Sequence, residues 1–236
     1  MAFYNAELER KGPGLLLRDI LKGEDPQIAS SVSTVAHVGA DVLVLSGFDF
    51  DYGLAALSAY AELLSDAGQL YPYRFANRPN TGWATGIDLD GNGRTGEPRD
   101  AQGYGSFSGQ DGMAVLSRFP ILEDQVQDFS AFLWADLPGA LIDGAELSPD
   151  ARQIQRLSTT AHWDVPVQLP NQVLRLLTFH ASPPVFDGPE DRNGRRNHDE
   201  ILFWIEYLDG ALPGDPPTDS FVLLGDMNLD PIDGDG

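Results

Sequence analysis

The sequence contains no cysteine, only two lysines, and no apolar run that approaches the length of a membrane-spanning helix. Without cysteine the protein forms no disulfide, no thiolate metal site and no cysteine nucleophile, although every redox compartment remains compatible. Because a spanning helix needs about 20 predominantly apolar residues, no membrane span is expected. The 236 residues are 42% hydrophobic, which is enough for a substantial core.

Positive charge is also scarce. Fifteen Lys and Arg oppose 36 Asp and Glu, so the formal net charge is −21. This negative charge repels polyanions, so nucleic acid is disfavoured as a partner unless cations intervene. An acidic substrate would likewise need a metal ion to bind. Thirteen of the fifteen basic residues are arginine, the side chain that holds phosphate or carboxylate through two parallel hydrogen bonds.

The start of the chain, MAFYNAE, has neither the basic segment nor the apolar stretch of a signal peptide. It resembles the interior of a strand instead. This start leaves the compartment open and is compatible with a secreted or periplasmic protein whose leader has been removed. The sequence does not indicate an oligomeric state.

Strand-like and helix-like segments alternate along the chain. Helical periodicity or capping signals mark 14–21, 27–38, 54–67 and 197–208, and Asp25-Pro26 starts the second of these. Short apolar runs predict strands at 2–5, 41–46, 113–116 and 221–225, with a strand pair at 157–167 and 173–181. No linker is visible, so we expect one domain over 1–236 of mixed α/β class, with two sheets packed face to face and helices outside.

Residues 77–110 form a long Gly-, Asp-, Asn- and Arg-rich stretch without periodicity, and loops of that length are usually functional or disordered. Within it, DLDGNG reproduces the first half of a helix-loop-helix calcium loop. The twelfth position is Arg99 instead of Glu, although Glu97 or Asp100 could replace it. Two readings stay open, a plain solvated turn or a calcium ion that pins the loop, held by Asp88, Asp90 and Asn92.

Four segments carry a resemblance to a known family. They are AFYN at 2–5, GMAVLSRFPI at 112–121, LLTFHASP at 176–183 and VLLGDMN at 222–228. Their order and context resemble the endonuclease/exonuclease/phosphatase superfamily, and the resemblance covers most of the chain. It implies a four-layer α-β-β-α sandwich of two mixed sheets and metal-dependent cleavage of phosphoester bonds. Because such proteins include nucleases, sphingomyelinases and inositol-phosphate phosphatases, the substrate class stays open.

The same resemblance suggests catalytic residues. Asp226 is the natural base or water-orienting carboxylate and a ligand for Mg²⁺ or Mn²⁺, and Asn228 can hydrogen-bond a phosphate oxygen. Alternatively, this pair only makes turn hydrogen bonds. The resemblance places His180 at the scissile phosphate and Asn5 near the metal or phosphate.

Three further residues are candidates for substrate binding. Arg78 and Asn80, in the segment RPNTG, could offer hydrogen-bond donors to a phosphate. Arg118, in LSRFP, could either bind substrate or anchor loops.

Two departures from the family weaken the catalytic interpretation. Gly47 occupies the place of a metal-binding Glu, so Asp49 or Asp51 would have to supply a carboxylate. The sequence also ends before the strands, the Asp and the final His with which family members continue, so a C-terminally truncated domain is expected. The rival function is a non-catalytic, calcium-stabilised binding relative of the same fold.

Overall fold

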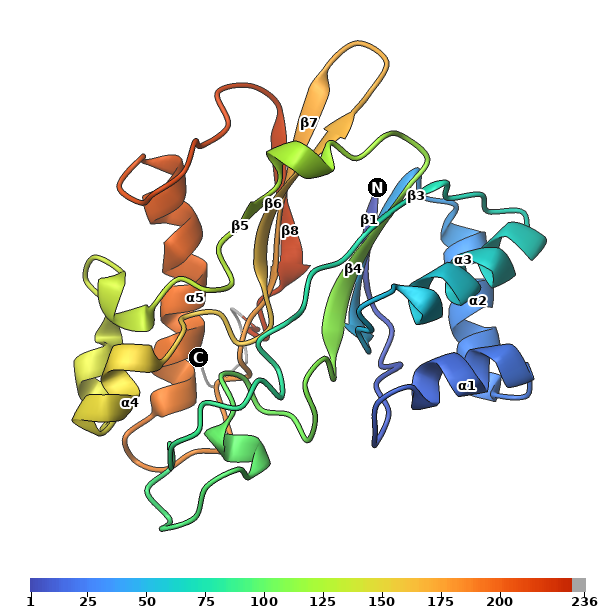
Figure 1. The fold of residues 1–236 in the computed structure, drawn as a ribbon. Helices are drawn as coiled ribbons and strands as arrows, with labels where there is room; N and C mark the ends of the chain where they lie inside the picture. The colour runs from blue at the N-terminus through green and yellow to red at the C-terminus, as the bar shows by residue number, and fades with distance from the viewer. Residues whose placement is uncertain (231–236) are drawn as a thin grey trace.

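The computed structural model describes residues 1–230 of the chain, which form two four-stranded sheets that face each other (Figure 1). The first sheet has the order β1-β2-β4-β3, with β1 (Ala2–Asn5), β2 (Val42–Phe48), β4 (Gly112–Ser117) and β3 (Tyr73–Phe75). The second has the order β5-β6-β7-β8, with β5 (Gln127–Asp128), β6 (His162–Gln168), β7 (Val173–His180) and β8 (Phe221–Asp226). Both sheets mix parallel and antiparallel pairs, as predicted.

Helices cover the outer face of each sheet and complete the four layers (Figure 1). The first sheet carries α1 (Leu15–Lys22), α2 (Pro26–Val38) and α3 (Ala55–Asp66), and the second carries α5 (Arg192–Leu208), with α4 (Pro149–Ile154) nearby. The N-terminus of α2 matches its sequence signal, because Asp25 accepts hydrogen bonds from the backbone of Gln27 and Ile28. No helix among the described residues has the length and apolar character needed to cross a membrane.

Two element boundaries differ from the sequence-based expectation. The strand predicted from residue 157 begins only at His162, and the helix predicted from residue 197 begins at Arg192. The later start of β6 has a structural cause. Buried Arg196 of α5 donates to backbone carbonyls of the segment before β6, including Leu157 and Ser158, and holds that segment out of the sheet.

Side-chain alternation along the strands decides which residues face the seam between the sheets. On β2, Leu43 and Leu45 pack toward the helices, whereas Val42 and Val44 join the core between the two sheets. Because successive side chains point to opposite faces, every second residue of a strand faces the seam between the sheets. At the ends of β1, β2, β7 and β8, the residue that faces the seam is polar. These residues are Asn5, Ser46, His180 and Asp226.

Strand direction brings these ends to one edge. β1 runs parallel to β2, with Asn5 opposite Ser46, and β7 runs parallel to β8, with His180 opposite Asp226. Each of the two strands β1 and β8 lies at the border of its own sheet, and the two contact each other across the seam. The four strand ends therefore form one polar edge, on which the segment that follows β3 also lies.

Candidate active site

Asn5, His180 and Asp226 converge at this edge, as the sequence predicted. The Asn5 amide donates from Nδ2 to Oδ2 of Asp226 at 3.4 Å, and Nε2 of His180 lies 3.8 Å from the same oxygen. Asp226 thus occupies the centre, with an amide from one sheet and an imidazole from its own sheet directed at one carboxylate oxygen.

The imidazole of His180 makes no hydrogen bond with the described residues. Its Nδ1 atom is buried without a partner, the residue is only 9% exposed, and 3.8 Å to Asp226 exceeds hydrogen-bond distance. Burial lowers the pKa of His180, and the charge of Asp226 partly opposes this shift. A neutral, buried imidazole without a partner is suited to receive a polar group that enters beside Asp226.

Asn228 lies in a turn that follows β8. Its backbone adopts φ +49°, its N–H donates to Oδ1 of Asp226 at 2.9 Å, and its Nδ2 donates to the carbonyl of Ala181 at 2.8 Å. The turn hydrogen bonds considered above are therefore present. They engage one oxygen of Asp226 and leave the other directed at Asn5 and His180.

Asn197, which the sequence analysis missed, holds the two catalytic loops together. Its buried Nδ2 donates to the carbonyls of Ser182 at 2.6 Å and Met227 at 2.7 Å. One helical side chain thereby joins the segment after β7 to the segment after β8. A single Asn in a predicted helix gives no sequence signal for this role.

Gly47 has a backbone that only glycine fits well. Its φ is +66°, and an added Cβ atom would lie 2.6 Å from the backbone nitrogen of Glu7 and 2.7 Å from Oδ1 of Asn5. Such distances are clashes, and a positive φ adds strain for any residue with a side chain. A glutamate could therefore not be restored here without moving the catalytic strand ends.

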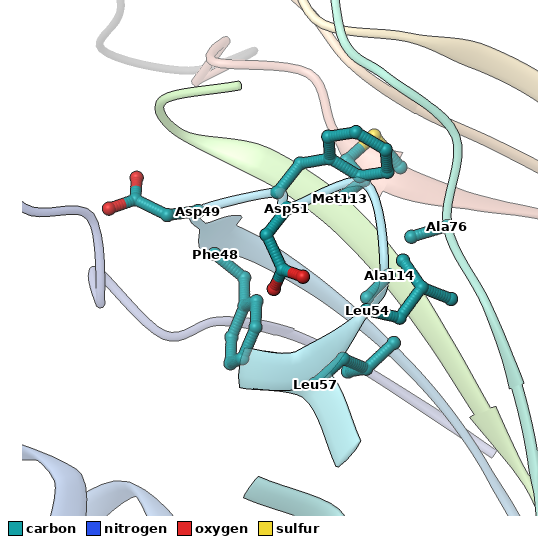
Figure 2. A pocket seen from close by; sticks show the side chains of 9 residues that line it. Phe48, Asp49, Asp51, Leu54, Leu57, Ala76, Met113 and Ala114 are labelled. Atoms are coloured by element: carbon teal, nitrogen blue, oxygen red, sulfur yellow. The ribbon is translucent and has the colours of Figure 1, made fainter. Parts of the chain in front are cut away.

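Asp49 and Asp51, expected to replace the missing ligand, are engaged elsewhere. Asp49 accepts the backbone N–H groups of Arg10 at 2.9 Å and Asp111 at 3.1 Å, one on each oxygen. Asp51 accepts the first N–H groups of α3, from Ala55 and Ala56. Figure 2 shows the two carboxylates beside a small hollow, pointing in different directions. They do not converge on a common cation position.

Asp111 adds an unforeseen carboxylate to this edge. It directly precedes β4, whose first residue, Gly112, pairs with Phe48 at the end of β2. The pKa of Asp111 is raised to about 7, first by burial and then by the charges of four acidic neighbours, namely Glu9, Asp49, Asp226 and Glu7. Burial likewise raises the pKa of Asp49 to about 6. An isolated Asp before Gly-Met-Ala resembles a turn residue, so sequence alone gave no reason to select it.

Two of the three predicted substrate contacts are placed elsewhere. Asn80 is fully buried, where its Nδ2 donates to Ser130 and Ser158 carbonyls and its oxygen accepts from Arg156. Arg118 follows the far end of β4 and bonds Asp41 at 3.0 Å, at the start of the β2 segment. That is the edge of the sheet opposite Asn5, so Arg118 anchors a loop there.

Arg78 alone remains an exposed cation on the side of the catalytic edge. It follows β3, and the next residue, Pro79, contacts Gly112 at the start of β4. Its guanidinium lies 3.8 Å from the ring centre of Trp83, on which Arg156 also stacks at 4.2 Å. Two cations on one indole make a local positive area in a strongly acidic protein.

The calcium-loop segment gathers oxygen atoms as its sequence suggested. Within the described part of the chain, the one group of three acidic or histidine side chains with ligand atoms within 4.8 Å of one another is Asp88, Asp90 and Asp100. Asp100 is buried and accepts from the backbone of Leu89 and Glu97. The third carboxylate therefore comes from Asp100, one place after the position that Arg99 occupies.

Known proteins of similar fold and sequence were found. A likeness is found to beta toxin from Staphylococcus aureus, in a mutant with bound magnesium ions (13% identity, TM-score 0.51, 98% of this chain and 64% of that chain). Another is to an endonuclease/exonuclease/phosphatase from Beutenbergia cavernae (17% identity, TM-score 0.50, 96% of this chain and 46% of that chain). The chain spans 63% of sphingomyelinase C from Streptomyces griseocarneus, at 19% identity and a TM-score of 0.47 over 97% of this chain.

At these identities the likenesses to beta toxin and to the Beutenbergia cavernae protein show the fold alone. No curated protein sequence matches the chain. The sequence model of the Endonuclease/Exonuclease/phosphatase family, however, matches residues 2–236, which is nearly the whole chain. The protein belongs to the Endonuclease/Exonuclease/phosphatase family.

Proposed function

We propose that the protein is a metal-dependent phosphoesterase whose centre is Asp226. The observation that carries the proposal is the convergence of Asn5 and His180 on one oxygen of Asp226, from opposite sheets of a fold that belongs to a phosphoesterase family. Phosphoester hydrolysis needs an oriented water molecule, compensation of charge on phosphate oxygens, and help for the leaving oxygen.

Asp226 supplies the carboxylate that orients and deprotonates the attacking water. Its Oδ2 atom is held by Asn5, while Oδ1 is fixed by the backbone N–H of Asn228. Because both oxygens have fixed partners, the carboxylate is positioned before substrate binds, which is the condition for efficient general-base catalysis.

His180 acts on the phosphate. Its imidazole is neutral at neutral pH, because burial lowers its pKa, and both ring nitrogens lack hydrogen bonds among the described residues. It can therefore donate one N–H to a non-bridging oxygen or to the leaving oxygen. Arg78 is the proposed second contact for phosphate, because it is exposed and follows β3 by three residues on this side of the sheet.

The donor set at the catalytic edge suits Mg²⁺ or Mn²⁺, since hard cations prefer carboxylate and amide oxygens. Asp226 and the amide oxygen of Asn5 would hold the ion, and the magnesium in the beta toxin structure supports this choice. When bound, such a cation lowers the pKa of a coordinated water and neutralises phosphate oxygens.

The proposal is tested by hydrolysis of an aryl phosphodiester and an aryl phosphomonoester with Mg²⁺, Mn²⁺ or Ca²⁺. Asp226→Asn should reduce turnover by about 10²-fold or more, the scale for one positioned acid-base group. Asp219→Asn is the matched control, because it removes the same charge from an exposed position before the opposite end of β8. Wild-type protein that is folded but hydrolyses neither ester would refute the proposal.

The rival function, a calcium-stabilised binding relative, is favoured by one observation. Gly47 leaves no room for the family's carboxylate, while Asp88, Asp90 and Asp100 gather oxygens away from the catalytic strand ends. A protein that binds calcium through this loop but shows no Asp226-dependent hydrolysis would have this second function.

A further inference from the structure

The backbone at Gly47 requires that any carboxylate at the end of β2 come from another part of the chain. Its positive φ and the 2.6–2.7 Å approaches to Glu7 and Asn5 exclude a side chain there. A divalent cation beside Asp226 nevertheless needs further negative oxygen ligands, because Asp226 is its one acidic ligand in the site described above.

The neighbouring carboxylates differ in whether they are free to bind. Asp49 and Asp51 each accept two backbone N–H groups that hold loops and the start of α3. Glu7 and Glu9 are exposed to solvent. Asp111 is partly buried, and its carboxylate accepts no hydrogen bond from any described residue.

The position of Asp111 is fixed from two sides. Its backbone N–H donates to Asp49 at 3.1 Å, and the next residue, Gly112, pairs with Phe48 at the end of β2. Asp111 therefore sits beside the strand end at which Gly47 lacks a side chain. That strand end also approaches Asp226 of the other sheet through Asn5: a Cβ atom at Gly47 would lie 2.7 Å from Oδ1 of Asn5, and Nδ2 of Asn5 lies 3.4 Å from Asp226.

A second, independent observation indicates a ligand at this place. His180 is nine-tenths buried, points its Nε2 at Asp226 from 3.8 Å, and has no hydrogen-bond partner among the described residues. Acidic groups gathered on one side and an unpartnered imidazole on the other are costly without a bound species that compensates both. A cation with a phosphate oxygen meets both needs.

We infer that Asp111 is the carboxylate that holds the divalent cation together with Asp226, in place of the side chain that Gly47 cannot carry. This inference rests on the proposed function and adds to it a residue that lies in a different segment from the family's ligand. It also explains why a partly buried aspartate persists among four other acids.

The test measures Mn²⁺ affinity by calorimetry, in an Asp90→Asn background that removes binding at the 88–100 loop. Asp111→Asn should weaken Mn²⁺ binding by about tenfold or more, the scale of losing a group that supports a metal site. The substitution preserves shape, and Asn tolerates the φ of +51° at this position. Glu9→Gln is the matched control, because it removes an equal charge nearby from an exposed side chain, and it should change affinity by less than about threefold.

The outcomes separate the inference from the proposed function. If Asp226→Asn abolishes Mn²⁺ binding while Asp111→Asn binds as tightly as the parent, the inference fails and the proposed function stands. If Glu9→Gln weakens Mn²⁺ binding as much as Asp111→Asn does, the affinity depends only on the total negative charge near the site, and the inference also fails. If Mn²⁺ binding and hydrolysis are both absent from the parent protein, the proposed function fails with it. Should Asp111→Asn not fold, Asp111→Gly, which accepts positive φ without strain, provides the same comparison.

Discussion

Asn5 donates its side-chain amide to Asp226 over 3.4 Å, although 221 positions separate the two residues in the chain. This contact joins the border strand of one sheet to the border strand of the other. It also places an uncharged amide, and not a second acid, against the central carboxylate.

The neutrality of Asn5 can be tested with Asn5→Asp. Two carboxylates at this distance repel each other, so the melting temperature in EDTA should fall by several degrees relative to wild type. Saturating Mn²⁺ should restore most of the loss, because a cation compensates the added charge. Thermal unfolding with and without Mn²⁺ measures both effects. An equal deficit in the two conditions would mean that no cation binds between these strands.

The buried pair Arg196 and Glu200 should dominate stability near the catalytic loops. Arg196 donates to four backbone carbonyls, and Glu200 accepts from the backbone of Thr159 and Ser182. Arg196→Met leaves these carbonyls without their donor and removes the charge that favours ionised Glu200, so it should lower the free energy of unfolding by about 3–5 kcal/mol, as measured in urea. Arg18→Met, at a side chain that is 63% exposed, should cost less than about 1 kcal/mol. Similar losses in both variants would contradict this.

The metal-free protein should lose stability as the pH rises from about 4 to about 8. The pKa values of Asp49, Asp111 and Glu200 are raised in the folded state to about 6, about 7 and about 7, chiefly by burial. Groups whose pKa is higher in the folded state stabilise it fully below the unfolded pKa, and this stabilisation is lost as the pH rises through the folded value.

Urea midpoints measured in EDTA at about pH 5 and about pH 8 check this expectation. The decline should be smaller in Asp111→Asn, which has one raised carboxyl fewer. Glu9→Gln serves again as the exposed control. An unchanged slope in Asp111→Asn would show that this group does not titrate in the expected range.

The 88–100 loop should bind calcium. Added Ca²⁺ should raise the melting temperature by mass action, and EDTA should reverse the change. Asp88→Asn should remove most of this shift, because Asp88 is one of the three clustered carboxylates. Asp124→Asn, at an exposed position outside the loop, should retain it. If Asp88→Asn retains the full shift, calcium binds elsewhere.

Local apolar runs in the sequence predicted the long strands. The four-layer sandwich, and the placing of His180 and Asn5 beside Asp226, came from the resemblance to the family. The structure brings these three side chains together at one edge. Of the two roles left open for Arg118, the structure supports loop anchoring, for a topological reason: β4 is antiparallel to β2, so the residue after β4 lies at the edge opposite Asn5.

The remaining site residues depend on contacts that local patterns do not encode. Asn80 follows a loop-like Arg-Pro, but it is buried because the carbonyls of Ser130 and Ser158 need donors. Asn197 and Asp111 are single polar residues whose partners lie in distant segments. The absence of a Glu at Gly47 was visible in the sequence, whereas the positive φ that forbids its return was not.

The contact between β1 and β8 also determines when, during folding, the side chains around Asp226 come together. β1 emerges first during synthesis, and β8 emerges after more than 200 further residues, so the Asn5–Asp226 contact closes a very long chain loop. Contacts of such sequence separation carry a high loop-closure entropy and form late in folding. The proposed centre around Asp226 therefore cannot assemble until both sheets have docked, and any hydrolysis that appears during refolding would report the completed sandwich and not either half.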